Sequence, residues 1–535
     1  MRAILMRLPL LVLVCGLAAL MMWLPAAHAS ITGHAAIARN FFYAGLLILV
    51  FCFLIGLAMQ GNRPDGRAPT MLLNMLAVFA GLPLILALPF AESLPDTGWF
   101  NAWWEMVSAL TTTGASLYSA DLLPQPLHLW RALVGWMGGF FVLVAAVAIL
   151  APLRVGGFEL MTNPQDTRRL ADTGQVLRRA ERAGPLIESA PNDPLLRVLR
   201  AAEAVLPPYA GLTLALWVGL LLAGDPSFLA LCRALGTLST SGISPVLGPA
   251  GEVSGFAGEA LVFLFLLPAL SRRFWPGGGT LRASERLRDD PELRLAAGLV
   301  ALVTAVLFLR HFIGAIEAGP DGQEPLAGIG AGLRALWGVA FNALSYLTTT
   351  GWNSNDWQGA RAWSGLTAPG LILAGLAMMG GGVATTAGGV KLLRVYALAR
   401  HGEREMQRII HPSAVAGGGR IARHLRREGA YLAFIFFMLF AISIAVVVAL
   451  VSIQAVEFET ATILSIAALT NTGPLAGAIP LTPVFEGSAG IASAPWEGWS
   501  GLPDMTKAIL AAAMIIGRIE TLAILALFSP EFWRR

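Results

Sequence analysis

The sequence has little charge. Asp, Glu, Lys and Arg make up only 13% of its 535 residues, whereas 56% are hydrophobic; soluble domains carry roughly 25% charged residues. Cysteine is also scarce. The three cysteines, Cys15, Cys52 and Cys232, lie in apolar surroundings without paired spacing, which excludes a disulfide framework and a cysteine-rich metal site. This composition excludes an ordinary soluble domain and indicates a polytopic membrane protein.

Ten apolar segments are long enough to cross a bilayer. Their approximate ranges are 4–26, 40–60, 70–91, 126–153, 204–223, 254–271, 295–316, 365–398, 430–455 and 505–528. The first segment ends in Ala27, His28 and Ala29, so it also fits a cleavable signal peptide; the length of its apolar run favours a retained helix.

The basic residues lie between these segments and are not gathered on one domain. Most of them occur at the two termini and in the segments 60–70, 154–200, 272–294 and 391–427. The segments 317–330 and 475–503 contain acidic residues but no Lys or Arg. By the positive-inside rule, this asymmetry places both termini in the cytoplasm of a multi-pass protein. The net charge of +4 therefore reflects membrane topology and does not indicate nucleic-acid binding.

Four shorter apolar segments, each of about a dozen residues, lie between candidate crossing helices and are too short to span. Each ends in one template: hydroxyl residue, Thr or Asn, hydroxyl residue, Gly. The four clusters are Thr111, Thr112, Thr113 and Gly114; Ser239, Thr240, Ser241 and Gly242; Thr348, Thr349, Thr350 and Gly351; and Thr470, Asn471, Thr472 and Gly473. Small residues also serve helix packing in membranes, but packing explains four such clusters poorly.

This internal repeat predicts an all-α integral membrane protein. We expect four like-oriented helix–pore-loop–helix repeats around a pseudo-fourfold pore, plus two additional N-terminal transmembrane helices. Extended loops at membrane depth can turn carbonyl oxygens toward the axis and replace the hydration shell of a monovalent cation. No carboxylate lies in the four clusters, which argues against a divalent-cation pore.

With these clusters, the sequence resembles the TrkH branch of the Trk/Ktr/HKT superfamily of potassium transporters, from about residue 70 to the C-terminus. The carrying motifs are TTTGAS at 111–116, STSGIS at 239–244, FNALSYLTTTGWNS at 341–354, ALTNTGP at 468–474, GGGVATTAGGVK at 380–391 and IIGRIE at 515–520. The resemblance implies potassium as the transported ion, bound by the four clusters as a selectivity filter, without a bound cofactor. The departures from the family pattern are Cys232, Arg233, Ser241, Ile243 and Trp352.

The stretch from Met378 to Lys391 contains five glycines inside an apolar segment. A glycine in a helix interior costs roughly 1 kcal/mol relative to alanine, so the stretch predicts a broken helix, with a kinked, closely packed helix as the alternative. Thr385 and Thr386 can satisfy backbone groups freed by the break. The resemblance implies an intramembrane gate beneath the filter, comprising Gly380, Gly381, Gly382, Thr385, Thr386, Gly388, Gly389 and Lys391.

Arg518 is expected near the middle of the last crossing segment, where an arginine costs about 2.5–3.5 kcal/mol and should face the interior or water. Glu520 is two residues away and points to nearly the opposite side of the helix, so it is a poor partner. The resemblance places a matching arginine in the pore as part of the gate. The alternative is an arginine that caps carbonyls of neighbouring helices.

We therefore divide the chain into two N-terminal transmembrane helices and four pore repeats with cytoplasmic connections. The ranges are 1–69 for the N-terminal helices, 70–160 for repeat 1, 161–203 for a cytoplasmic loop, 204–275 for repeat 2, 276–294 for a cytoplasmic loop, 295–400 for repeat 3 with the gate, 401–429 for a cytoplasmic loop and 430–535 for repeat 4.

The resemblance also implies a homodimer in the cell inner membrane and a cytoplasmic nucleotide-binding regulatory subunit of the TrkA type. The Arg-rich loops fit anionic membrane lipids equally well. No catalytic constellation is present in the sequence, so we do not expect an enzyme. The remaining alternative is a sodium- or proton-coupled monovalent cation symporter of the alternating-access type, although such folds favour inverted repeats.

Overall fold

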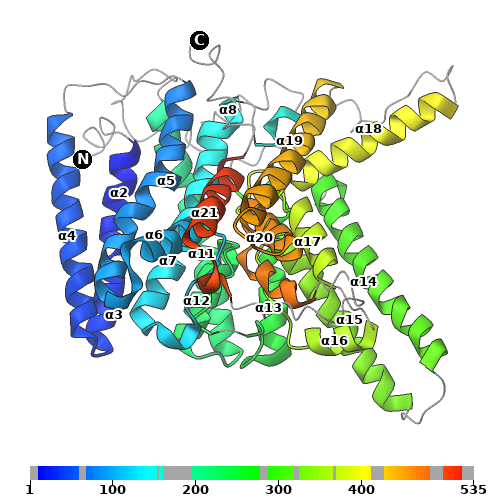
Figure 1. Ribbon diagram of the computed structural model, residues 1–535. Helices are drawn as coiled ribbons and strands as arrows, with labels where there is room; N and C mark the ends of the chain where they lie inside the picture. Colours follow the sequence, from blue (N-terminus) through cyan, green and yellow to red (C-terminus); the bar gives the residue numbers. More distant parts are fainter. Residues whose placement is uncertain are drawn as a thin grey trace, which may run out of the picture.

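The computed structural model describes residues 10–59, 68–153, 156–160, 194–246, 248–276, 287–318, 325–364, 369–410, 427–481 and 498–520 (Figure 1). Within these ranges all regular structure is helical, and there is no β-strand. The predicted cytoplasmic loops 161–203, 276–294 and 401–429 fall partly or largely outside the described residues, as do both chain termini.

Seven helices of the described part are long and apolar enough to cross a membrane, which confirms the prediction of an all-α membrane protein. They are Leu10–Ile31, Ala35–Ala58, Thr70–Ser93, Gln125–Leu153, Leu195–Leu222, Pro291–Arg310 and Gly429–Ser452. In the ribbon they belong to α2 (Leu10–Met21) with α3 (Trp23–Ile31), α4 (Ala35–Ala58), α5 (Ala68–Ser93), α7 (Gln125–Ala145) with its continuation to Leu153, α11 (Pro194–Leu222), α14 (Pro291–Ala318) and α19 (Arg427–Ser452).

Three predicted crossing segments form shorter helices in the described part. These are α13 (Gly255–Leu266), α17 (Pro369–Met379) and α21 (Asp504–Ile519). The helix α13 gives way to a 3-10 turn that contains Pro268. The helices α17 and α21 end where Gly380 and Glu520 each adopt a φ of 71°, a left-handed conformation that a right-handed helix cannot continue.

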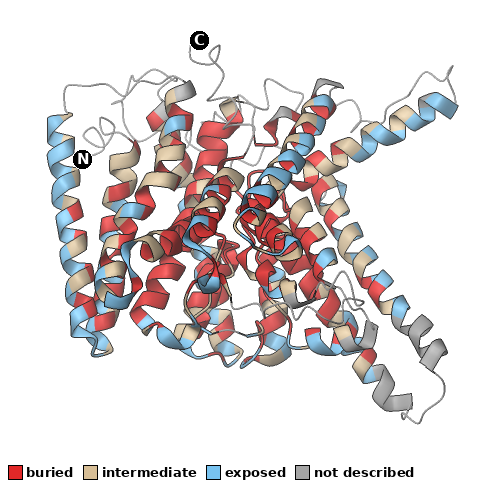
Figure 2. Cartoon of the chain, in the orientation of Figure 1, coloured by how far each residue is buried: buried red, intermediate tan, exposed pale blue. Residues whose placement is uncertain are grey.

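The interior is built around α7, whose residues are mostly buried, whereas α4 lies at the edge with most of its side chains exposed (Figure 2). The exposed side chains of α4 include Leu47, Phe51 and Phe53, so its outer face suits contact with lipid. Inside, glycine permits close packing: a β-carbon added at Gly138 of α7 would overlap the carbonyl oxygen of Leu110.

Each hydroxyl cluster follows directly on one helix, and these four helices are called the loop helices below. They are α6 (Trp99–Leu110), α12 (Ser227–Leu238), α15 (Pro325–Leu347) and α20 (Phe458–Thr470). Three have 12 or 13 residues, as expected, but α15 has 23, so the expectation of a short third segment is wrong. The helix begins at Pro325, a favourable first position, and no later proline interrupts it.

Candidate functional site

The four clusters share a left-handed second residue, and the glycines of the first three also have positive φ values. We call the clusters loop 1 (111–114), loop 2 (239–242), loop 3 (348–351) and loop 4 (470–473). The second residue of every loop is left-handed, with φ of 57° at Thr112, 55° at Thr240, 58° at Thr349 and 55° at Asn471. This conformation costs a residue with a β-carbon roughly 1–2 kcal/mol, less for Asn. Its occurrence at the same position of four loops identifies it as part of the architecture.

Backbone N–H groups of the loops donate hydrogen bonds to carbonyl oxygens of their own loop helices. In loop 1, the N–H groups of Thr113 and Gly114 both donate to the carbonyl oxygen of Ser108, over 2.9 and 3.2 Å. The same pair of bonds reaches Gly236 from loop 2, at 2.9 and 3.3 Å, and Ser345 from loop 3, at 3.0 and 3.2 Å. In loop 4, only Thr472 bonds back in this way, to Ala467 over 2.8 Å.

The hydroxyl groups of the first and third residues pair within every loop. The oxygen–oxygen distances are 2.8 Å for Thr111 and Thr113, 2.9 Å for Ser239 and Ser241, 3.1 Å for Thr348 and Thr350 and 3.1 Å for Thr470 and Thr472. All these side chains are buried. Ser241, a departure from the family pattern, therefore makes the same contact as threonine does elsewhere.

The loops close a ring in the order 1, 2, 3, 4, because each loop glycine lies directly against the next loop. A β-carbon added at Gly114 would overlap the carbonyl oxygen of Ser241, and one at Gly242 would overlap that of Thr350. The corresponding neighbours are Pro474, the residue directly after loop 4, for Gly351, and Ala115 and Thr113 for Gly473. The structure thus brings all sixteen predicted filter residues together.

Loop 4 donates hydrogen bonds to loop 1 and to α21. The N–H of Gly473 donates to the carbonyl oxygen of Thr113 over 2.6 Å. The amide nitrogen of Asn471 donates to the hydroxyl of Thr113 over 3.1 Å and to the carbonyl oxygen of Met514 over 2.9 Å. Asparagine in place of threonine therefore links loop 4 to loop 1 and to α21.

The glycine-rich segment is a true break between α17 and α18 (Leu392–Ile410), so the kinked-helix alternative is wrong. Within the break, Gly380, Ala384, Gly389 and Lys391 have positive φ values between 54° and 85°. The segment lies against the ring: the N–H of Gly388 donates to the hydroxyl of Thr349 over 2.8 Å, and a β-carbon on Gly388 would overlap the carbonyl oxygen of Thr470.

The other end of this segment is held by the 3-10 turn after α13 and by the first turn of α14. The N–H of Gly382 donates to the carbonyl oxygen of Ala269 over 2.9 Å, and that of Val383 donates to the buried carboxylate of Glu292 over 2.8 Å. Sequence reasoning missed Glu292, whose only signal was an acidic residue at the start of an apolar helix.

Within the segment, three predicted residues have different surroundings. Thr385 bonds to the carbonyl oxygen of Gly382 over 2.8 Å, as expected of a residue that satisfies freed backbone groups. The buried hydroxyl of Thr386 has no hydrogen-bond partner in the described part of the chain. The ammonium group of Lys391 donates to the carbonyl oxygen of Ala387.

Arg518 lies in the last turn of α21, and the rest of the predicted crossing segment, from 521 to 528, lies outside the described residues. Arg518 is buried, and its Nε and Nη2 atoms have no hydrogen-bond partner among the residues that the structure describes. These two atoms therefore cap no helix carbonyl there. Glu520 is not its partner: that carboxylate pairs with Arg394 over 2.8 Å.

The apolar helices, the ring of four loops and the broken helix together define a class, the polytopic α-helical membrane protein. Residues 293–535 match the family model TrkH, described as a cation transport protein. The chain is 30% identical to the Trk system potassium uptake protein TrkH of Halomonas elongata, over 86% of this chain and 84% of the relative. The chain therefore belongs to the TrkH family, a family of transporters and not of enzymes.

Further comparisons agree with this membership. Identity is 28% to the Trk system potassium uptake protein TrkH of Escherichia coli strain K12, over 86% of this chain and 84% of the relative. Identity is 26% to the Trk system potassium uptake protein TrkG of the same strain, over 86% of this chain and 83% of that relative. The crystal structure of the potassium transporter TrkH from Vibrio parahaemolyticus has the same fold, with a TM-score of 0.74, 22% identity and full coverage of both chains.

The buried ion pair between Arg394 and Glu520 yields a stability prediction. Glu520→Ala removes the carboxylate, and Arg394, which also lies 3.6 Å from the centre of the Phe436 ring, stays buried. We expect the free energy of unfolding to fall by about 3–5 kcal/mol, because removing one partner leaves the other charge buried without compensation. The measurement is thermal unfolding of the protein in detergent. The double variant Arg394→Met with Glu520→Met is the control, since it removes both charges and should recover most of the loss. An unchanged unfolding temperature in Glu520→Ala would contradict the prediction.

Proposed function

We propose that this protein mediates potassium uptake across the cell inner membrane and that loops 1 to 4 form its selectivity filter. The relatives named above are potassium uptake proteins, and the chain shares their family. The observation that carries the proposal is the cyclic order of the loops, in which each glycine lies against the next loop. Four equivalent loops in a closed ring are the arrangement that a fourfold ion pathway needs.

The chemistry of the ring suits a monovalent cation. The N–H groups at the end of loops 1 to 3 are used by the loop helices, so the loop carbonyl oxygens are the groups available to a dehydrated ion. The paired hydroxyls add oxygen atoms without fixed charge. A ring without carboxylates favours a monovalent over a divalent ion, and potassium is the proposed cargo at the sixteen filter residues.

The gate in this proposal is the segment 380–391 together with Arg518. The segment contacts loops 3 and 4 through Gly388, so a movement of the segment would displace residues of these two loops. The buried guanidinium of Arg518, with two nitrogen atoms that bind no described residue, is a fixed positive charge that would oppose a passing cation.

The proposal includes the repeat boundaries given above, cytoplasmic termini, contact with anionic lipids and a homodimer with a TrkA-type regulatory subunit. These assignments follow from the family resemblance and from the distribution of Lys and Arg.

The second candidate is an alternating-access symporter driven by sodium or protons. Purified protein in liposomes separates the two: a potassium gradient alone drives flux through a filter pore, whereas a symporter also needs its coupling ion. Complementation of a potassium-uptake-deficient bacterium at limiting potassium tests the uptake function itself. Failure to complement, with the protein present in the membrane, would contradict it.

Gly114→Ser should reduce the preference for potassium over sodium. Gly114 has a φ of 74°, and a side chain there would overlap the carbonyl oxygen of Ser241, so loops 1 and 2 must separate. We expect the potassium-to-sodium flux ratio in liposomes to fall by about tenfold, which corresponds to ~1.4 kcal/mol. The control is Gly375→Ser, since a β-carbon at Gly375 meets nothing within 4 Å. An unchanged ratio in a folded variant would remove loop 1 from the filter.

Gly381→Ala should alter flux without altering selectivity. A β-carbon at Gly381 would crowd Ala387 and lie 2.5 Å from the carbonyl oxygen of Ala269, away from the ring. Gly388 is unsuitable for this test because it contacts loop 4 directly. We expect potassium flux to change by at least about threefold, since the close contact displaces the segment. Gly375→Ala is the control. Wild-type flux and regulation would contradict the gate, and a changed selectivity ratio would mean that gate and filter are not separable.

Arg518→Ala should raise cation flux. Removing a buried positive charge lowers the barrier to a passing cation, and we expect an increase of about tenfold, or ~1.4 kcal/mol. The control is Arg518→Lys, which keeps the charge and should keep flux near the wild-type level. If the alanine variant unfolds or conducts as the wild type does, Arg518 has a structural role and lies outside the pathway.

A further inference from the structure

Behind the ring, three of the four loop helices carry a polar or charged residue at one equivalent position, nine residues before the loop glycine. These residues are Glu105 before Gly114, Arg233 before Gly242 and Asn342 before Gly351; in the fourth helix the position is Leu464. All four side chains are buried, with 2% exposure or less. A buried polar group costs free energy unless it is hydrogen-bonded, so its repetition at this position points to a role.

The side chains at this position hold the chain that leaves each loop. In repeat 3, the Oδ1 atom of Asn342 accepts the N–H of Ser354 over 2.9 Å. In repeat 1, the Oε2 atom of Glu105 accepts the N–H of Leu117 over 3.0 Å. Ser354 and Leu117 are each three residues beyond their loop glycine, so the same bond is made at the same point of both repeats.

In repeat 2 the residue three beyond the loop glycine is Pro245, which has no N–H to donate, and Arg233 bonds to the exit further along the chain, seven residues beyond Gly242. The guanidinium of Arg233 donates through Nη2 to the carbonyl oxygen of Pro249 over 3.0 Å, in the chain that leaves loop 2. Arg233 is one of the departures from the family pattern, and this contact explains what it does in a loop helix.

Each charge at this position is neutralised nearby. Glu105 lies 2.5 Å from Arg131 of α7, and Arg233 lies 2.9 Å from Asp225. The neutral Asn342 needs no counter-charge. The chain leaving loop 3 is held in addition by Glu259 of α13, which accepts hydrogen bonds from the hydroxyl of Ser354 over 2.8 Å and the N–H of Asn355 over 2.5 Å. Buried charges are tolerable only when paired and hydrogen-bonded in this way.

The fourth repeat shows why leucine suffices there. After loop 4 the chain continues directly as a 3-10 helix, Gly473–Leu481, and the N–H of Leu475 bonds locally to the carbonyl oxygen of Thr472 over 3.0 Å. The residue equivalent to Leu117 and Ser354 is Ala476, which lies inside this 3-10 helix, where an N–H bonds to the carbonyl oxygen three residues before it and needs no side-chain acceptor.

We propose that Glu105, Arg233 and Asn342 are positioning residues that fix the exits of loops 1 to 3 and thereby set the ion selectivity of the ring. This inference rests on the proposed function of the loops as a filter. The loop carbonyl oxygens lie between two attachments, the loop helix on one side and the anchored exit on the other. Moving the exit moves these oxygens, and selectivity depends on how they surround the ion.

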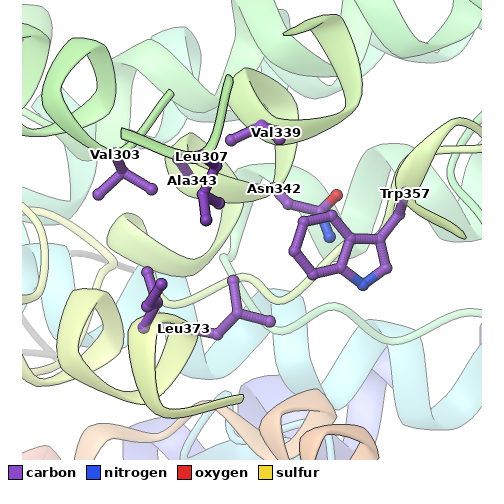
Figure 3. A pocket seen from close by; sticks show the side chains of 8 residues that line it. Val303, Leu307, Val339, Asn342, Ala343, Trp357 and Leu373 are labelled. Carbon is purple, nitrogen blue, oxygen red and sulfur yellow. The ribbon is translucent and has the colours of Figure 1, made fainter. Parts of the chain in front are cut away.

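Asn342 offers the sharpest test, because it lies beside a small apolar cavity that is also lined by Val339, Leu373 and Trp357 (Figure 3). Asn342→Leu removes the acceptor and introduces the residue found in repeat 4. Asn342→Gln keeps a side-chain amide oxygen as the acceptor for Ser354 and adds no buried charge. Val339→Ala is the matched control, because it removes packing from the same cavity and helix without touching the hydrogen bond.

The measurement is the potassium-to-sodium flux ratio of each full-length variant in liposomes, with thermal unfolding in detergent as the measure of structural damage. We expect the ratio to fall at least about threefold in Asn342→Leu. The free energy that corresponds to this change lies within the net contribution of one hydrogen bond. The ratio should stay within about twofold of wild type in Asn342→Gln and in Val339→Ala. If the leucine variant does not fold, Asn342→Ala removes the same acceptor and leaves more space.

Two outcomes overturn the inference. One is an unchanged ratio in a folded variant that lacks the acceptor. The other is an equal fall in all three variants, which would mark Asn342 as structural only. Gly114→Ser, measured in parallel, separates this result from the proposed function. If Gly114→Ser changes the ratio and the Asn342 variants do not, the loops are a filter and the positioning role is wrong; if neither changes it, the filter proposal fails as well.

Discussion

A buried peptide group must find its hydrogen-bond partner inside the protein, and the ring of buried loops depends on this constraint. The loops are not helical, so their N–H groups need acceptors other than those of a regular helix. Carbonyl oxygens at the ends of the loop helices provide them, as Ser108 does for Thr113 and Gly114. This attachment in turn requires the left-handed residue in each loop and brings the glycines against their neighbours.

The sequence is sufficient to predict the helical membrane fold, the four clusters and the break at 380–391, because composition, repetition and glycine content report on local backbone preferences. It is not sufficient to predict the cyclic contacts, such as Gly242 against Thr350, which join residues far apart in the chain. The sequence also does not predict the pairing of Glu520 with Arg394, because this ion pair depends on how α21 ends and where α18 lies. The sequence also underestimates the length of α15, because the first residues of this helix, 326–332, are rich in glycine, which is more typical of loops.

The broken segment between α17 and α18 has two different neighbours. At Gly388 it contacts loops 3 and 4. Gly382 bonds to Ala269 in the turn after α13, and Val383 bonds to Glu292 in the first turn of α14. A segment attached at both ends to separate elements responds to relative movement of those elements. Its glycines and positive φ values supply the backbone freedom that such a response requires.

The position nine residues before the loop glycine is occupied by glutamate, arginine, asparagine and leucine in the four repeats. In an assembly of four identical subunits, symmetry would place the same side chain and the same neutralising partner at all four positions. A single chain that contains all four quarters is free of this restriction. Fusion of the repeats therefore permits each quarter of the ring to be adjusted separately, with opposite charges behind neighbouring loops.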